Sequence, residues 1–312
     1  MLEIVNITII SFLTALVDLG LAYRFRSLPL YRRHFYLSVA LILVPCAVLP
    51  LSLGTQALGV FIGLTLPALV RMPTRAWLPH SWSKGATRRP DATRPLVVIA
   101  DPHWSQDTGH LQELQKKYTQ VDWLFLGDCF DLWIGLPHYE TSTQKAFLQW
   151  VDERRQEGAW VGLWLGNREY FLDYLAPRFD LIGEGIGGEL VEESLYFEHG
   201  DLINQKDLQY RLWNLLSRSS LTWILFRLLP SNWGRKLGSW LELKLKTTNQ
   251  NYKIMFPQEA FRDVVKTVSP STFIVGHFHT AHHVDNGEVI PWNHCGDHAI
   301  WWQGQLKVQS HP

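Results

Sequence analysis

The sequence has few cysteines, no basic segment at its N-terminus and no net charge. Such features argue against some classes of protein. Its 312 residues contain three cysteines, whose spacing matches neither a disulfide framework nor a metal-binding repeat, which indicates a reducing compartment. The N-terminus lacks the basic region and the small-residue cleavage site of a secretory signal, so we expect no cleaved signal peptide. Basic and aromatic residues do not interleave as in nucleic-acid-binding surfaces, so we expect no nucleic-acid partner.

The formal net charge of zero conceals an uneven distribution of charge. Residues 1–94 contain 10 lysines and arginines against 3 acidic residues, whereas residues 95–312 contain 19 against 26. The N-terminal part is therefore basic and apolar, and the remainder has the composition of a mildly acidic globular domain. The length is sufficient for one sizeable hydrophobic core with an appendage.

Charged residues are absent from residues 35–70, a run of 36 positions. A single helix of this length would extend about 54 Å, well beyond the roughly 30 Å hydrocarbon core of a bilayer. Pro45 and Pro50 interrupt the run, which favours two helices that form a membrane hairpin; a buried helical hairpin in a soluble domain is the alternative. Residues 4–23 are long enough for another span but contain Asp18, so they fit either a span or an interfacial helix.

Arginines flank the apolar run on both sides. By the positive-inside rule both flanks face the cytoplasm, so we expect an inner-membrane protein whose globular domain faces the cytoplasm and whose partners include the lipid bilayer. The expected domains are membrane-anchoring helices over residues 1–71, a basic juxtamembrane linker over 72–95, and a globular domain over 96–312 with a helical insertion at 204–255. The basic linker would also favour anionic lipids.

From residue 96 onward, apolar runs alternate with more polar segments, which predicts a layered α/β core. Strands are expected in LVVIA, WLFLGD, AWVGLWLGN, SLYFEHGD and STFIVGHFHT, at residues 96–100, 123–128, 159–167, 194–201 and 271–280. Helices are expected near residues 106–118 and 141–157. A turn at residues 285–287 should join two further strands, and short Trp-rich strands should end the chain.

Each predicted strand ends in side chains that can bind metal ions. In chain order these side chains are Asp101 and His103, Asp128, Asn167, His199, and His277 with His279. Oxygen ligands combined with imidazoles suit Mn²⁺, Fe or Zn²⁺ in a two-metal site, where a shared carboxylate bridges ions about 3.5–4 Å apart. One such motif could be a turn or part of the core, but five in order indicate a dinuclear metallohydrolase for phosphoryl displacement.

These motifs resemble those of the calcineurin-like metallophosphoesterase superfamily, namely Asp-x-His, Gly-Asp, Gly-Asn-His, Gly-His and Gly-His-x-His. The resemblance covers residues 96 to about 310 and implies a layered β-sandwich flanked by helices. It implies two divalent ions, with Mn²⁺ expected first, and a catalytic role for Asn167, Arg168 and His277. One ion would be held by Asp101, His103, Asp128 and His279, and the other by Asp128, Asn167, His199 and His277.

The sequence departs from the superfamily pattern at Arg168, where most members have histidine. GNREYFL, which contains Arg168, and GDCFDLWIG are similar to one branch, the UDP-2,3-diacylglucosamine diphosphatases of lipid A biosynthesis. The resemblance implies that the substrate is a lipid-linked nucleotide sugar, a UDP-diacylated amino sugar, whose pyrophosphate is hydrolysed to UMP and a diacylated sugar 1-phosphate. The alternatives are a membrane-bound enzyme for another phosphodiester or phosphomonoester, and a non-catalytic membrane scaffold. The usual members lack the apolar N-terminal region.

Arg168 has two interpretations. Its guanidinium could hold two phosphate oxygens of the pyrophosphate, or it could pair with Glu169 or Asp173. Asp131 likewise could orient a metal ligand or cap the following turn.

Further substrate contacts are implied by the resemblance. They are Asp207, Tyr210, Lys244, Lys246 and Lys253. A solvated basic face would explain the lysines equally well. The apolar segment at residues 211–230 fits either an acyl-chain chamber or membrane-contacting lid, or packing against a second helix at 233–245.

Overall fold

The computed structural model describes residues 82–84, 90–105, 108–190, 194–204, 207, 210, 213–214, 217–218, 220–238, 240, 256–268, 272–292 and 297–309. The expected membrane helices at residues 1–71 and most of the linker lie outside these residues. Within the described part of the chain, no helix is long and apolar enough to cross a membrane. The chain divides into two compact units, a first of Met1–Trp82 with Gln205–Arg227 and a second of Ser83–Asn204 with Leu228–Pro312.

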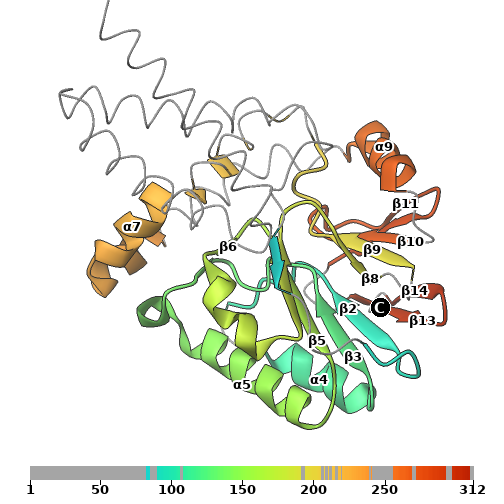
Figure 1. Cartoon of the computed structure of the whole chain (residues 1–312), viewed down its shortest axis with the longest axis horizontal. Coiled ribbons are helices and arrows are strands. Elements are labelled where there is room, and N and C mark those ends of the chain that lie inside the picture. Colours follow the sequence, from blue (N-terminus) through green and yellow to red (C-terminus); the bar gives the residue numbers. More distant parts are fainter. Residues whose placement is uncertain are drawn as a thin grey trace, which may run out of the picture. The chain divides into compact units, whose positions relative to one another are not determined.

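A seven-stranded mixed sheet lies in the second unit, with the strand order β1-β7-β5-β3-β2-β13-β14 (Figure 1). Its parallel strands are β2 (Leu96–Ile99), β3 (Asp122–Phe125), β5 (Val161–Leu165) and β7 (Leu181–Glu184). Antiparallel to β2 runs β13 (His298–Trp302), which also pairs with β14 (Gln305–Gln309), and β1 (Trp82–Lys84) forms the other edge. Because the parallel strands end at one edge of the sheet, the residues that follow them are brought together.

Two helices cover one face of this sheet, α4 (Gly109–Lys117) and α5 (Ser142–Gln156) (Figure 1). Helix α5 begins at a capping box, in which Thr141 and Gln144 each accept a hydrogen bond from the backbone N–H of the other. The rings of Phe125 in β3 and Phe147 in α5 pack with centroids 5.1 Å apart. All residues of β2, β3 and β5 are buried, as expected for parallel strands in a sheet that is covered on both faces.

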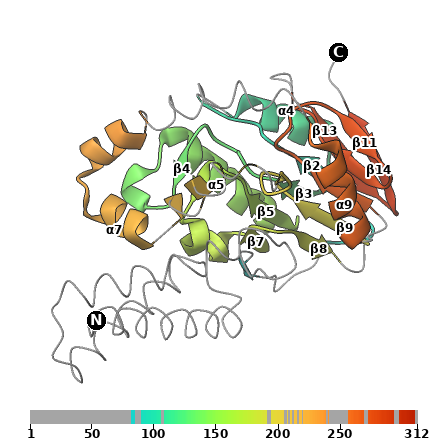
Figure 2. The same cartoon turned by 90° about the horizontal axis from the view of Figure 1, so that it is seen from above.

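A five-stranded sheet, β11-β12-β10-β9-β8, packs on the other face. Its strands are β8 (Gly188–Leu190), β9 (Leu195–Glu198), β10 (Thr272–Val275), β11 (His282–Val284) and β12 (Gly287–Val289). The core between the sheets includes Val98 and Leu124 from the larger sheet and Phe197 and Ile274 from the smaller one. Helix α9 (Gln258–Val268) covers the outer face of the smaller sheet (Figure 2). The α/β class predicted from the sequence is confirmed.

Several short elements were not predicted. They are the parallel pair β4 (Trp133–Ile134) and β6 (Glu169–Tyr170), the strands β7 and β8, and the 3-10 helices η2 (Pro137–Tyr139) and η3 (Leu172–Arg178). Strands of two to four residues and 3-10 helices of three to seven residues are too short to show a clear hydrophobic period in the sequence. The pair β4 and β6 matters below because it fixes the backbone on both sides of Arg168 and Glu169.

Within the expected insertion at 204–255, the structure describes α7 (Ser220–Leu228) and a helix at residues 231–238. The second helix belongs to the second unit and packs closely on η2 through Gly234, where an added Cβ would lie 2.0 Å from the Tyr139 hydroxyl oxygen. A helix was predicted here, at residues 233–245. Whether residues 211–230 serve as an acyl-chain chamber stays a prediction.

Candidate metal centre

Five of the seven predicted ligands have a left-handed backbone conformation. They are Asp101 (φ 53°), His103 (φ 47°), Asp128 (φ 48°), His277 (φ 65°) and His279 (φ 59°). Such a conformation costs a residue other than glycine on the order of 1–3 kcal/mol, and it persists only where the surrounding structure enforces it. All five residues follow the last residue of a strand, at the edge where the parallel strands end. Backbone strain is therefore concentrated where the sequence places the metal ligands.

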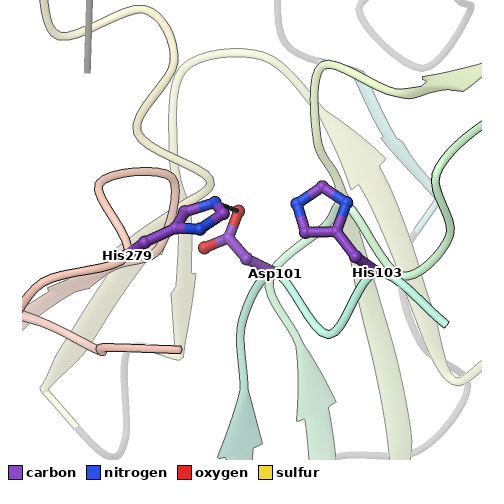
Figure 3. A group of neighbouring side chains, drawn as sticks. All are labelled: Asp101, His103 and His279. Carbon is purple, nitrogen blue, oxygen red and sulfur yellow. Dashed lines mark ion pairs between the residues drawn. The ribbon is translucent and has the colours of Figure 1, made fainter. Parts of the chain in front are cut away.

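Asp101, His103 and His279 form one cluster, in which one potential ligand atom of each lies within 4.8 Å of the others (Figure 3). Asp101 and His103 follow β2, whereas His279 follows β10. The His279 Nε2 atom is 3.8 Å from the Asp101 Oδ1 atom, and the two imidazole rings have centroids 5.3 Å apart. Asp101 is buried, while both histidines are partly exposed. The cluster can therefore be reached from solvent on its imidazole side.

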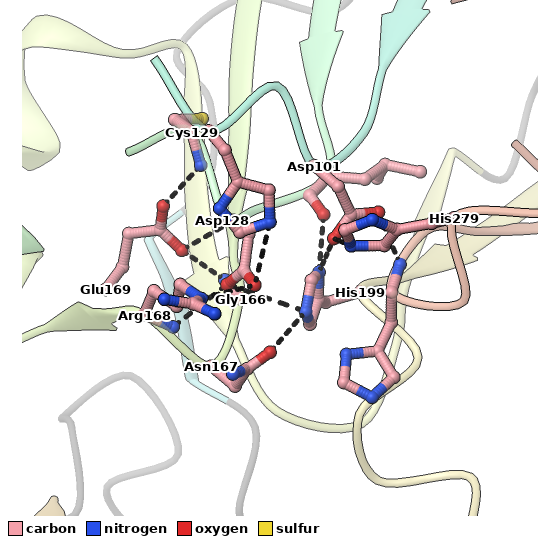
Figure 4. Close-up of polar contacts among 12 residues, drawn as sticks. Asp101, Asp128, Cys129, Gly166, Asn167, Arg168, Glu169, His199 and His279 are labelled. Carbon is pink, nitrogen blue, oxygen red and sulfur yellow. Dashed lines mark hydrogen bonds and ion pairs between the residues drawn. The ribbon is translucent and has the colours of Figure 1, made fainter. Parts of the chain in front are cut away.

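Asp101 also belongs to a second cluster with Asp128 and His199, and all three residues are buried. The His199 Nε2 atom is 3.7 Å from Asp128 Oδ1, and its Nδ1 atom is 3.9 Å from Asp101 Oδ1 (Figure 4). The two clusters share a carboxylate and so are contiguous, as a site for two neighbouring ions requires.

The donor atoms fit divalent metal ions. The His199 Nε2 and Asn167 Oδ1 atoms are 3.0 Å apart. Two ligands that each lie about 2.1 Å from one ion, at a right angle to each other, would be about 3.0 Å apart. Carboxylate and amide oxygens combined with imidazole nitrogens form the mixed donor set that suits Mn²⁺, Fe or Zn²⁺. The buried Asp and His clusters thus support the predicted metal binding at this edge of the sheet.

The distribution of the ligands between two ions stays a prediction. Asp101, rather than the predicted bridge Asp128, takes part in both clusters. His277 lies beside His199, with ring centroids 5.1 Å apart, and its backbone N–H donates a hydrogen bond to Asp101 Oδ2. All seven predicted ligands are therefore linked to one another by contacts at this single edge.

His199 is buried among acidic side chains. Burial lowers the pKa of the imidazole, but the carboxylates of Asp128, Asp101 and Asp201 outweigh this effect and raise the pKa to about 9. The Nδ1 atom lies 2.7 Å from the carbonyl oxygen of Leu126, to which a protonated Nδ1 donates. Without metal, His199 is therefore protonated at neutral pH, and a metal ion that binds Nε2 must displace a proton.

Arg168 is only 4% exposed and contacts the metal centre. Its Nε atom is 3.5 Å from Asp128 Oδ2, and its Nη1 atom donates a hydrogen bond of 3.1 Å to the carbonyl oxygen of Asp131. The guanidinium thus pairs with a carboxylate, but among the described residues this partner is Asp128 rather than Glu169 or Asp173. Contact of Arg168 with a substrate phosphate stays a prediction.

The other predicted contacts are placed as follows. The Asp131 Oδ1 atom is 3.6 Å from His103 Nδ1, a position that orients the imidazole of a ligand. Asp207 and Tyr210 lie in the first unit, where the Asp207 carboxylate accepts a hydrogen bond from the backbone N–H of Tyr210. Their contact with substrate stays a prediction. The same holds for Lys244, Lys246 and Lys253, which lie outside the described residues.

Glu169 was predicted only as a partner of Arg168, and its position in the centre was not predicted. Its fully buried carboxylate accepts hydrogen bonds from the backbone N–H groups of Asp128, Cys129 and Gly166 (Figure 4). Burial and the nearby Asp128 carboxylate raise its pKa. The available signal was an acidic residue within two positions of the predicted ligand Asn167, followed by the apolar residues Tyr170 and Phe171.

No protein-family model matches the chain. A UDP-2,3-diacylglucosamine hydrolase from Histophilus somni (strain 129Pt) is 26% identical over 209 residues, which cover 60% of this chain and 84% of that protein. A protein of the same name from Pseudomonas entomophila (strain L48) is 27% identical over 198 residues, which cover 61% of this chain and 76% of that protein. The chain is therefore a distant relative of proteins with this name.

Among solved structures, a conserved uncharacterized protein from Streptococcus pneumoniae TIGR4, titled a predicted phosphoesterase, aligns with a TM-score of 0.27 and 12% sequence identity. The alignment covers 70% of this chain and 98% of that protein.

Proposed function

We propose that this chain is a metal-dependent phosphohydrolase that cleaves the pyrophosphate bond of a UDP-diacylated amino sugar. The observation that carries the proposal is the group of buried carboxylates and imidazoles around Asp101, gathered at one edge of the parallel strands. The distant relationship to UDP-2,3-diacylglucosamine hydrolases supports the choice of substrate. The products would be UMP and a diacylated sugar 1-phosphate, as in lipid A biosynthesis.

Two divalent ions, with Mn²⁺ as the first candidate, would supply an activated water and would offset the charge of the phosphoryl group that is attacked. Asp101, His103 and His279 would hold one ion. Asn167, His199 and His277 would hold the other, with Asp128 shared between the two. The buried carboxylates keep His199 close to its ligand position, and Asp131 orients His103 in the same way.

Arg168 would bind the pyrophosphate. The guanidinium is fixed by the Asp131 carbonyl at Nη1 and by Asp128 near Nε, so its remaining donors can hold phosphate oxygens in a defined direction. The departing group in pyrophosphate cleavage is a phosphate monoester with a second pKa of about 6, which leaves without a proton. A guanidinium cannot donate that proton near neutral pH, but it can offset charge as the bond breaks.

A lipid-linked substrate requires the enzyme to work at a membrane surface, and we extend the proposal to the cytoplasmic face of the inner membrane. The uncharged run at residues 35–70 supports this location. So do Trp233 and Trp240, which are 71% and 54% exposed and lie seven positions apart. The segment 220–240 contains three basic residues and no acidic one, which favours contact with anionic lipid headgroups.

Hydrolysis assays with purified full-length protein and Mn²⁺ test the proposal. We expect UMP release from the UDP-diacylated amino sugar with a kcat/KM at least about 10-fold above that for an aryl phosphodiester, a difference of about 1.4 kcal/mol in transition-state stabilisation. The opposite preference would favour an enzyme for other phosphodiesters or phosphomonoesters. Failure to hydrolyse any of these substrates, by a protein that binds Mn²⁺, would favour the scaffold.

A further inference from the structure

We propose that Glu169 is a positioning residue that holds two ligand loops of the metal centre at a fixed distance, so that metal binding depends on it. The inference rests on the proposed function in one respect, because it takes Asp128 and Asn167 as metal ligands. Glu169 itself need not touch a metal ion or the substrate. Its effect would pass through the backbone of the two loops.

The first observation is that one carboxylate oxygen bridges the two loops. The Glu169 Oε2 atom accepts hydrogen bonds of 2.8 Å from the backbone N–H of Asp128 and of Gly166 (Figure 4). The Oε1 atom accepts a third, of 2.6 Å, from Cys129. Asp128 and Cys129 follow β3, whereas Gly166 follows the neighbouring strand β5. Beyond the ends of β3 and β5, backbone hydrogen bonds between the strands no longer set the distance between the two segments. The Glu169 carboxylate sets it there instead.

The second observation is that the loops after β3 and β5 lie so close together that a small shift of one loop must displace the other. A Cβ added to Gly127 would lie 2.3 Å from the backbone nitrogen of Gly166, so the two backbones are in direct contact. The backbone N–H of Arg168 also donates a hydrogen bond of 2.9 Å to Asp128 Oδ1. The ligand carboxylate of Asp128 is thus oriented by the same short stretch of chain that contains Glu169.

The third observation is that the backbone of Glu169 is itself held. Glu169 lies in β6 and pairs with Trp133 of β4. On one side of it the Trp133 N–H donates to the Arg168 carbonyl, at 2.9 Å, and on the other the Gly135 N–H donates to the Tyr170 carbonyl, at 2.7 Å. Because its backbone is hydrogen-bonded on both sides, the side chain reaches the two loops from a defined position.

A buried carboxylate that accepts backbone N–H groups can also be purely structural, and the chain provides such a case for comparison. Asp122 is 1% exposed and accepts hydrogen bonds from the backbone N–H of Trp160, at 2.8 Å, and of Asp91, at 2.7 Å. It links the beginnings of β3 and β5, whereas Glu169 links the loops after their ends. Asp122 is therefore a matched control for the loss of a buried acceptor far from the metal ligands.

The variant Glu169→Gln keeps the size of the side chain but has a single acceptor oxygen. In either orientation of the amide, its NH₂ group faces at least one of the three N–H donors. The loops must then separate or rotate. The variant Glu169→Asp keeps the charge but is one methylene shorter, so that it cannot reach both loops at once.

The test is a Mn²⁺ titration of the metal-free full-length protein in detergent by calorimetry, together with thermal unfolding. We expect Glu169→Gln to weaken Mn²⁺ binding about 10- to 100-fold, the usual effect of losing a partner that orients a ligand. Asp122→Asn should lower the unfolding temperature at least as much and change the Mn²⁺ affinity less than about 2-fold. Mn²⁺ affinity of Glu169→Gln equal to that of the unsubstituted protein would overturn the proposal.

If Glu169→Gln does not fold, Glu169→Asp is titrated in its place, with the same expected loss and the same contradicting result. The measurement also separates this inference from the proposed function, because no substrate is present. Failure of the unsubstituted protein to bind Mn²⁺ would contradict the metal centre itself. Binding by the unsubstituted protein and by the Glu169 variant with equal affinity would contradict only the role of Glu169.

Discussion

The buried aspartates at the two ends of the parallel strands have different surroundings. Where the strands begin, Asp122 accepts two backbone hydrogen bonds, and Asp180 accepts one from Val161 while it pairs with Arg155 at 3.0 Å. Where the strands end, Asp101 and Asp128 lie beside imidazoles and a guanidinium, with a left-handed backbone.

This difference shows how one fold combines stability and binding. An acceptor that is satisfied by backbone N–H groups stabilises the attachment of one parallel strand to the start of its neighbour. Asp101 and Asp128 each accept a backbone hydrogen bond too, from His277 and Arg168, but their left-handed backbone and the imidazoles beside them place them for a positively charged ligand. The starting edge of the sheet thus holds carboxylates that stabilise the fold, and the finishing edge holds those that fit the proposed metal ions.

The largest expected effect comes from Asp128→Asn. Asparagine tolerates the left-handed conformation, so the fold should be retained. Removal of the charge that two metal ions would share should lower kcat/KM on the order of 10³-fold or more. Steady-state kinetics and a thermal unfolding curve measure the two effects. Full activity in a folded Asp128→Asn protein would contradict the dinuclear centre.

The next largest effect is expected for Arg168→Ala, which should cost about 2 to 4 kcal/mol of transition-state stabilisation, the range for loss of one preorganised donor. The loss in kcat/KM should be larger on a diphosphate than on an alkyl phosphodiester. Arg168→His serves as the control and should not improve cleavage of the diphosphate, because a phosphate leaving group needs no acid. Equal losses on both substrates would show that Arg168 has no role specific to pyrophosphate.

In the metal-free protein, the stability of the folded state should depend on pH through His199 at the finishing edge. The pKa of His199 in the folded protein, about 9, lies above the ordinary histidine value of 6.5, so the folded state holds this proton more tightly than the unfolded chain does. The resulting stability, up to about 3 kcal/mol, is present in full below about pH 6.5 and is lost as the pH rises through 9.

Urea unfolding of the metal-free protein between about pH 6.5 and pH 9.5 measures this loss, and His199→Gln should remove it. Saturating Mn²⁺ should reverse the slope, because the ion competes with the proton for His199. A metal-free protein whose stability does not fall over this range would show that the folded state does not hold an extra proton on His199.

The smallest effect on activity is expected for Asp122→Asn. Loss of a charged acceptor for two backbone N–H groups should lower the free energy of unfolding by about 1 to 3 kcal/mol. kcat/KM should change by less than about 2-fold, since Asp122 lies at the edge opposite the predicted metal ligands. Steady-state kinetics of the two variants, measured well below their unfolding temperatures, test this prediction. A loss of activity in Asp122→Asn similar to that in Asp128→Asn would contradict the proposed difference between the two edges.

Much of the candidate site could be predicted because strand ends can be recognised in a sequence. A short apolar run that stops at Asp101 or at His277 marks the end of a buried strand, and parallel strands bring such ends to one edge. For this reason Asp101 and His279, 178 positions apart, could be assigned to one site before their distance was known.

Contacts between loops could not be predicted in this way. The acceptor role of Glu169 depends on how the loops after β3 and β5 approach each other, and the pairing of Arg168 with Asp128 depends on the same approach. No hydrophobic period encodes that geometry. The short pair β4 and β6, which fixes these residues, was likewise invisible as a pattern.

The central claim is that the finishing edge of the parallel strands binds two metal ions. Crystals of the full-length protein grown with Mn²⁺ test it directly through anomalous scattering. We predict two neighbouring anomalous peaks, both in contact with the group formed by Asp101, His103, Asp128, Asn167, His199, His277 and His279. No peak at this edge, or peaks only elsewhere on the protein, would contradict the account.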